Sequence, residues 1–267
     1  MKFAIVTGAS SGIGLHYATQ LARDYHYPLL LISNQAAELE ALAHQLSEAY
    51  GVDAIPYYCD LSQADAADRI YAFCQERGIE VEVLVNNAGM LIFDAFIHAP
   101  MAKTETLLML HVVTATKLCR LFAPEMCERG RGFILNMSSM SAWMAMPSIV
   151  CYNASKSYVL NFSRALWYEL RPKGVHVLAV TPGSTDTGLL PFGDTFGRIL
   201  RAVGITMPPE RLVRSALRSL FHSRRKRCMP GAWNHIIVPI INHLPDWVVF
   251  TAMRHFPMFQ AIQKPKE

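Results

Sequence analysis

The chain has 267 residues, of which 52% are hydrophobic and 17% are charged, and its formal net charge is +4. This length allows a large core, in one α/β domain or in two smaller domains. A charge of +4, scattered along the chain, is too small to indicate a nucleic-acid surface, so we expect no nucleic-acid partner. The apolar content indicates a buried sheet or an apolar ligand, and composition does not choose between them.

The six cysteines show no C-x-x-C spacing and lie within periodic segments, at Cys59, Cys74, Cys119, Cys127, Cys151 and Cys228. We expect them to be reduced core residues, and we predict no metal site. The chain opens directly into an apolar strand, so we expect no signal peptide before the fold. These features favour a cytoplasmic location.

Short apolar strands alternate with helices as far as residue 180. Strands are expected at 3–7, 29–33, 54–59, 81–85, 133–137 and 175–180. Helices are expected at 15–24, 39–49, 63–77, 104–129 and 151–170, with Ser62 capping the third and Pro124 bending the fourth or marking a boundary near its end. The alternation predicts an α/β fold, a Rossmann-type doubly wound parallel sheet with helices on both faces.

The pattern changes after Pro182. Residues 183–207 show no period, and we expect a substrate lid at about 188–207. A helix at 209–222 then carries arginines on one face, and the basic run 224–227 follows it. We predict one domain over 1–230 and an apolar extension over 231–267 that packs on it.

The segment 224–262 joins that basic run to a strongly apolar stretch. Residues 231–262 contain no uncharged run of about 18 residues, the length that spans a bilayer. The segment could rest on an anionic membrane surface, or the tail could pack over the substrate mouth or a subunit interface. We also expect a homo-oligomer, a dimer or a tetramer.

Three features indicate a cofactor crevice at the carboxyl ends of the strands. The glycines Gly8, Gly12 and Gly14 follow the first strand and open a helix, where backbone N–H groups suit a pyrophosphate. Asp60 follows the third strand, and the segment 86–89, Asn-Asn-Ala-Gly, ends the fourth. Each feature alone is compatible with an ordinary turn or helix cap.

Tyr152 and Lys156 stand four residues apart on an expected helix, so they share one face. A cation beside a phenol favours the phenolate, which makes tyrosine a usable acid and base near neutral pH. By itself this spacing is common by chance.

Five motifs together resemble the classical short-chain dehydrogenase/reductase family over residues 3–187. They are Thr7-Gly8-Ala9-Ser10-Ser11-Gly12-Ile13-Gly14, Asn86-Asn87-Ala88-Gly89, Ser138-Ser139, Tyr152-x-x-x-Lys156 and Pro182-Gly183. The resemblance implies that Ser139 holds a substrate carbonyl, that Tyr152 donates or accepts the proton, and that Lys156 binds the nicotinamide ribose and lowers the tyrosine pKa. It implies a cofactor site formed by Gly8, Ser10, Ser11, Gly12, Ile13, Gly14, Asp60, Leu61, Asn87, Ala88, Gly89, Tyr152, Lys156, Pro182, Gly183 and Thr187.

One position departs from the family pattern. His111, thirteen residues before Pro124, stands where the family usually has an asparagine that bends the helix and holds a water linking the lysine to solvent. Histidine also donates and accepts, and it titrates near neutrality, so we favour a working proton relay. A buried structural role is the alternative.

The end of the second strand bears on cofactor choice. Ser33 stands where enzymes of this type that use NAD usually have an acidic residue, and Asn34 brings no positive charge. With no carboxylate to repel a 2′-phosphate, the pattern favours NADP(H), and NAD(H) remains the alternative.

Apolar residues surround the expected substrate position. They are Met140, Trp143, Met144, Met146 and Ile149, with Leu189, Leu190, Phe192 and Phe196 in the expected lid. They favour a small hydrophobic ketone or secondary alcohol, lipid-like or steroid-like, unless they are ordinary core. The expected activity is NAD(P)-dependent hydride transfer, and the alternative is a dinucleotide-binding sensor or scaffold with little or no turnover.

Overall fold

The protein contains one seven-stranded parallel sheet, which confirms the predicted fold class. The computed structural model describes residues 2–183, 185 and 207–255. The strand order is β3-β2-β1-β4-β5-β6-β7. Strands β2 and β3 are added on one side of β1 and strands β4 to β7 on the other, so the order of connection switches between β1 and β4. The strands are β1 (Lys2–Thr7), β2 (Leu29–Ser33), β3 (Ala54–Tyr58), β4 (Glu80–Asn86), β5 (Gly132–Met137), β6 (Val175–Val180) and β7 (Arg227–Cys228).

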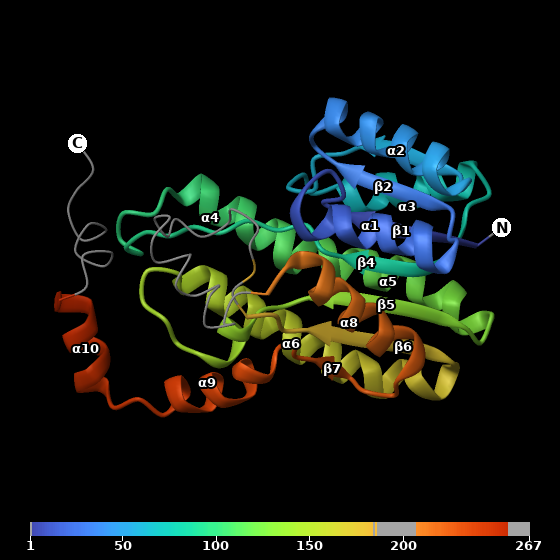
Figure 1. Cartoon of the computed structure of the whole chain (residues 1–267). Coiled ribbons are helices and arrows are strands. Elements are labelled where there is room, and N and C mark those ends of the chain that lie inside the picture. The colour runs from blue at the N-terminus through green and yellow to red at the C-terminus, as the bar shows by residue number, and fades with distance from the viewer. Residues whose placement is uncertain (1, 184, 186–206, 256–267) are drawn as a thin grey trace.

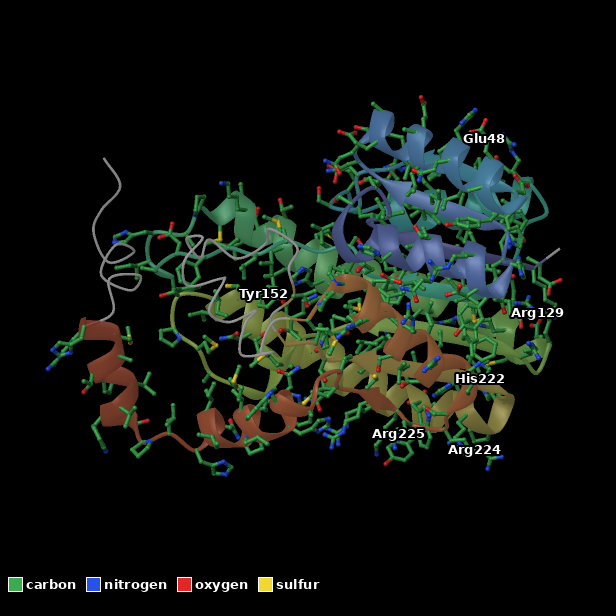
Figure 2. All side chains as sticks on the ribbon, in the orientation of Figure 1. Glu48, Arg129, Tyr152, His222, Arg224 and Arg225 are labelled. Carbon is green, nitrogen blue, oxygen red and sulfur yellow. The ribbon has the colours of Figure 1, made fainter. Side chains whose placement is uncertain are left out.

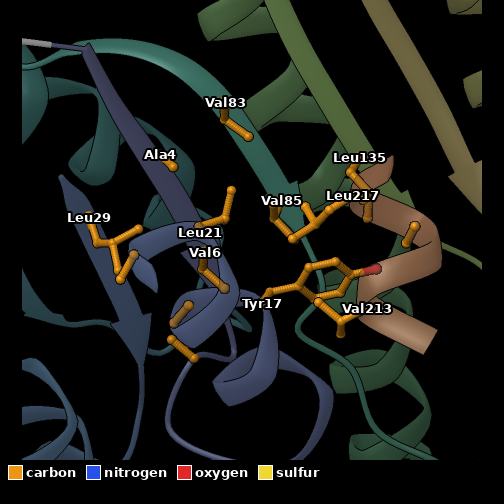
Figure 3. Close-up of a cluster of buried hydrophobic side chains, with 14 of the residues drawn as sticks. Ala4, Val6, Tyr17, Leu21, Leu29, Val83, Val85, Leu135, Val213 and Leu217 are labelled. Carbon is orange, nitrogen blue, oxygen red and sulfur yellow. The ribbon is translucent and has the colours of Figure 1, made fainter. Parts of the chain in front are cut away.

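Helices cover both faces of the sheet (Figure 1). Because alternate strand residues point to opposite faces, Ala4 and Val6 of β1 join one hydrophobic cluster while Phe3 and Ile5 join the other. The first cluster lies under α1 (Gly12–Tyr25), α2 (Ala36–Tyr50) and α8 (Pro209–His222), and Figure 3 shows Tyr17 at its centre. The second lies under α3 (Ala66–Glu76), α5 (Ala115–Glu128) and α6 (Val150–Leu170).

The long predicted helix is present but is irregular at its middle. It consists of α4 (Met101–Leu108), the π-helix η1 (Met109–Thr114) and α5, and Pro124 lies inside α5. The irregular turn contains His111. By length and composition, Met101–Glu128 is the one unbroken helix of the described part that could cross a membrane, but Leu118, Phe122 and Met126 are buried in the second core cluster.

One local prediction was wrong, and one strand was not predicted. The third helix begins at Ala66 with Asp65 at its N-cap, not after Ser62, because the Asp60 carboxylate accepts from the backbone N–H of Ser62 at 3.0 Å and holds the preceding turn. The basic run 224–227 also contributes to the sheet, because Arg227 and Cys228 form β7 beside β6. A two-residue strand has no period that a sequence could display.

The C-terminal extension leaves the domain as two helices, α9 (Ala232–Asn242) and α10 (Asp246–His255) (Figure 1). The helix α9 buries Asn234 and Val238, whereas α10 buries none of its side chains. Only α9 therefore shows the packing expected of this extension. All six cysteines are free thiols, four of them buried and two half-buried.

Candidate active site

A cleft of about 650 Å³ opens at the carboxyl ends of the strands. Its walls contain most of the site residues expected from the sequence. These are Gly8, Ser10, Ser11, Gly12, Ile13, Ser33, Asn34, Asp60, Leu61, Asn87, Ala88, Gly89, His111, Ser139, Tyr152, Lys156, Pro182 and Gly183. Gly14 lies behind the wall, and Thr187 lies outside the described residues.

The glycine turn leaves the start of α1 open toward this cleft. A Cβ on Gly14 would lie 1.9 Å from the carbonyl oxygen of Gly8, so the end of β1 and the start of α1 pack too closely for any side chain there. Ser11 is the N-cap of α1 but makes no side-chain cap, and no acidic residue lies in the first turn. The positive end of the helix is therefore available to an anion such as a pyrophosphate.

The segment after β4 is held against this turn by hydrogen bonds. The hydroxyl oxygen of Thr7 accepts from the backbone N–H groups of Asn87 at 2.9 Å and Ala88 at 3.0 Å. The side chain of Asn87 donates back to the Thr7 carbonyl at 3.0 Å. The two loops form one rigid wall, although the motifs that make them are 80 residues apart in the chain.

The end of β2 carries a cluster of neutral polar groups. The Ser10 hydroxyl donates to the side-chain oxygen of Gln35 at 2.6 Å and lies 2.8 Å from the Ser33 hydroxyl, while Asn34 lines the cleft beside them. None of these four residues is charged, and among the described lining residues the one carboxylate is Asp60 after β3, which binds Ser62 and Gln63. Sequence reasoning missed Gln35, although its place directly after Asn34 could have marked it.

Ser139, Tyr152 and Lys156 meet at the far end of the cleft. Burial raises the pKa of Tyr152, and a hydrogen bond with Ser139 opposes that rise. The Lys156 ammonium donates to the Met137 carbonyl at 2.9 Å and lies 5.6 Å from the centre of the Tyr152 ring. Burial lowers the pKa of Lys156 to about 7, and the pKa of Tyr152 is raised rather than lowered, so the expected stabilisation of the phenolate by this cation is not observed.

Residues at the carboxyl end of β5 and directly after it bind α6. The Ser138 hydroxyl donates to the Lys156 carbonyl at 2.7 Å. Behind it, the Asn136 amide donates to Ser163 at 2.9 Å and accepts from Asn86 at 2.8 Å. This network sets where Tyr152 and Lys156 stand, and sequence patterns gave no signal for Asn136 or Ser163 because their partners are distant in the chain.

His111 is held as a neutral ring. Its Nε2 accepts from the Met90 N–H at 3.1 Å, so Nδ1 carries the proton and donates to the Ser155 hydroxyl at 2.8 Å. Burial, and then the charge of Lys156, hold the pKa of His111 well below its usual value. The lowered pKa differs from the titration near neutrality that the sequence suggested, and both ring nitrogens bind groups of the chain itself.

The His111 ring also leaves no space for a side chain at Gly89 in the wall of the cleft. A Cβ on Gly89 would lie 2.7 Å from Nε2 of His111. The Ser155 hydroxyl in turn donates to the Tyr152 carbonyl at 2.8 Å, and the rings of His111 and Tyr152 meet edge to face. His111 therefore connects the segment after β4 with the first turn of α6.

The substrate side of the cleft is apolar, as expected for Met140, Met144, Met146 and Ile149, which line it. Trp143 does not line it, because its ring lies under the Arg227 guanidinium at 5.2 Å. Lining residues that the sequence did not indicate are Met90, Leu91, Thr106, Leu110, Ser141 and Thr185. The expected lid residues Leu189, Leu190, Phe192 and Phe196 lie outside the described residues.

Comparison with known proteins adds to this geometry. A family model described as short chain dehydrogenase matches residues 2–192. A very-long-chain 3-oxoacyl-CoA reductase of Anas platyrhynchos is 34% identical over 246 residues, which cover 89% of this chain and 76% of the relative.

Two solved structures are similar over almost their whole length. A short-chain dehydrogenase from Sphingobium yanoikuyae in complex with NADPH has a TM-score of 0.77 and 27% identity, covering 100% of this chain and 98% of the other. A bulky-bulky ketone specific alcohol dehydrogenase from Comamonas testosteroni has a TM-score of 0.76 and 28% identity, covering 96% and 99%.

Proposed function

The chain belongs to the short-chain dehydrogenase family and is an NAD(P)H-dependent oxidoreductase, and from that premise we propose that it transfers hydride between NADP(H) and a hydrophobic ketone or secondary alcohol. The observation that carries this proposal is the meeting of Ser139, Tyr152 and Lys156 at one end of a cleft whose other end is the glycine turn. A protein that only senses a dinucleotide does not require a proton donor, a hydrogen-bond donor to a substrate carbonyl and a lysine at that place.

The chain's own groups account for the proton chemistry. The nicotinamide cofactor, when bound, supplies or takes the hydride. Because the pKa of Tyr152 is raised, its phenol stays protonated at neutral pH and can give a proton to the oxygen of a carbonyl under reduction. Ser139 would hold that oxygen by a hydrogen bond, and Lys156 would bind the ribose side of the cofactor.

NADP(H) fits the end of β2 better than NAD(H). Ser10, Ser33, Asn34 and Gln35 offer hydroxyl and amide groups, and none of the four brings a carboxylate that would repel a 2′-phosphate. The similar Sphingobium protein was solved with NADPH.

Replacing Ser33 with Asp should weaken NADPH binding at least about tenfold, because it places a carboxylate beside the 2′-phosphate, and should leave NADH binding nearly unchanged. Titration by cofactor fluorescence measures both, and equal loss for the two cofactors would contradict the assignment.

A substrate with a long or bulky apolar group fits the other side of the cleft. Met140, Met144 and Met146 are flexible apolar side chains that adapt to extended hydrophobic ligands. The names of the similar proteins point the same way, one to very-long-chain 3-oxoacyl-CoA and one to bulky ketones. We therefore assign a lipid-like or steroid-like ketone as the substrate class.

The test is NADPH oxidation with 3-oxoacyl esters of increasing chain length, steroid ketones and small ketones. We expect turnover to improve with apolar size, and Tyr152→Phe to lower kcat/KM by about a thousandfold or more because the proton donor is lost. Tyr158→Phe is the matched control, since Tyr158 lies on the same helix, is absent from the cleft lining and places its hydroxyl 3.1 Å from that of Thr116.

Cofactor binding without turnover of any of these carbonyls would overturn the enzyme assignment. The sensor or scaffold would then be the better explanation. A cytoplasmic location and a homo-oligomer stay predictions that the described residues do not test.

A further inference from the structure

The helices α9 and α10, together called the apolar arm, expose large apolar side chains. Trp233, Ile236 and Ile240 lie on the outer face of α9, opposite the buried Asn234 and Val238. On α10, Trp247 is 70% exposed and Phe250 is 60% exposed. Aromatic and aliphatic groups exposed in one contiguous stretch mark an interaction site more often than chance exposure does.

The arm has the form of a segment that lies on a bilayer rather than one that crosses it. The two helices have 11 and 10 residues, so each is only about 15 Å long, half of the hydrocarbon core of about 30 Å. Taken together they are apolar enough to span, but they meet at an angle of 103°. The charged residues of α10 lie near its two ends, at Asp246 and Arg254, and α9 has none.

A basic surface adjoins the arm. The segment 209–227 holds seven of the chain's 25 Lys and Arg residues and one of its 21 acidic residues, so the remaining chain is net negative. Arg211, Arg214, Arg218 and Arg225 line one groove, and only Arg214 pairs with a carboxylate there, Glu210 at 2.7 Å. Among the described residues, no ion pair neutralises the other three.

The basic surface is continuous with the beginning of α9. Residues 224–227 line a second groove together with Met229 and with His235 of α9. Figure 2 shows Arg224 and Arg225 on the lower edge of the molecule, along which α9 also runs, while α10 lies at the far left end and Tyr152 lies further in. Positive charge beside exposed tryptophans is the arrangement of a surface that binds anionic lipid.

We propose that the apolar arm and the basic surface together form a docking face for an anionic phospholipid bilayer. A second copy of the chain is the weaker occupant, because a two-fold interface on this face would bring the same uncompensated arginines toward each other. The docking itself does not depend on the proposed reaction. Its use for delivering a lipid-like ketone to the cleft does rest on the proposed function.

Vesicle co-sedimentation of the full chain tests the face. Phosphatidylcholine vesicles with and without about one third phosphatidylserine are compared at low salt and in 0.5 M salt. We expect binding to the anionic vesicles that falls in high salt. Quenching by brominated lipid should reach Trp233 and Trp247, two of the four tryptophans, and should be lost when both are changed to Phe.

Two variants separate the contributions. Trp233→Ser with Trp247→Ser should weaken binding roughly tenfold or more, because it removes the apolar anchors. Arg224→Gln with Arg225→Gln should weaken it roughly twenty-five-fold, at about a fivefold change for each cation near an anionic surface. Tyr58→Ser with Arg77→Gln is the matched control, since Tyr58 is exposed on β3 and Arg77 is the C-cap of α3, a helix that Figure 1 shows on the other side of the molecule from α10.

Absence of binding to anionic vesicles at low salt would overturn the proposal, and so would unchanged binding by both variants. If the tryptophan variant instead turns a dimer into a monomer in sedimentation velocity without changing vesicle binding, the arm is a subunit interface. Should a variant fail to fold, the salt dependence and the lipid quenching of the parent chain still decide the question. Activity on a water-soluble ketone is followed in parallel, so loss of turnover is not mistaken for loss of docking.

Discussion

The sheet and the apolar arm use similar residues in opposite ways. All five residues of β2, four of them Leu or Ile, are buried, whereas α10 with Trp247, Val248, Val249 and Phe250 buries none. In the sheet the chain covers its own apolar groups and gains stability from them. The exposed apolar side chains of the arm need a surface outside the chain, for which we propose the bilayer. An apolar sequence thus predicts that its side chains are buried, but it does not show whether the chain itself or another surface covers them.

The largest expected effect is in the sheet region. Phe122 is 1% exposed and packs in the cluster under α5. Phe122→Ala should lower the free energy of unfolding by about 3–5 kcal/mol, because it removes apolar contacts and leaves a cavity. Urea denaturation followed by circular dichroism measures this. A loss below about 1 kcal/mol would mean that the two regions differ less than their burial suggests.

Burial of Lys156 in the cleft should lower the free energy of unfolding of the protein near neutral pH. Its pKa is lowered from 10.5 to about 7, so between these values the unfolded chain binds more protons than the native one. Stability of the parent should therefore rise with pH across this window. Lys156→Met should be roughly 2–3 kcal/mol more stable at pH 7, with the difference shrinking toward pH 10.5, and inactive.

Thermal unfolding at several pH values checks the prediction for Lys156. Lys173→Met serves as the control because Lys173 is exposed in η3 (Arg171–Lys173) and Lys156 stays in place, so the stability of this variant should follow that of the parent at each pH. A Lys156→Met protein that is less stable than its parent at pH 7 would show that the hydrogen bond to Met137 outweighs the burial.

His111 should act by position rather than by titration. Because it binds both Met90 and Ser155, His111→Ala should lower kcat/KM by about ten- to a hundredfold, while His111→Asn, which can keep one of these bonds, should lose less. Neither change should move a pH-rate limb near neutrality. If a limb between pH 6 and 7 disappears in His111→Asn, the proton relay is correct instead. His235→Ala, at an exposed histidine of α9, is the control.

The smallest effect is expected in the arm. Phe250→Ser should change the free energy of unfolding by less than about 0.5 kcal/mol, since the side chain is 60% exposed and its helix buries no residue. The same denaturation experiment as for Phe122 measures it. A loss comparable to that of Phe122→Ala would show that the arm is packed by the chain itself, and would break the contrast between the two regions.

Sequence reasoning was most accurate where the structure depends on nearby residues. The bounds of β2 and β6 and of α8 agree with those predicted, because each has a strong apolar period and a turn or proline at its ends. It was least accurate at irregular places. The π-helix around His111, the strand β7 and the turn held by Asp60 arise from distant contacts or from single hydrogen bonds, which no period reveals.

The sequence by itself determined the alternation of strands and helices, the glycine turn and the spacing of Tyr152 and Lys156, since all of these depend on residues within a few turns of each other. The tertiary structure decided the rest. It set the ionisation of Lys156 and His111, because burial and neighbours from other elements fix the pKa of a side chain. It also separated Trp143 from the cleft and left Trp233 and Trp247 on the surface, because exposure depends on what packs on a helix and not on the helix alone.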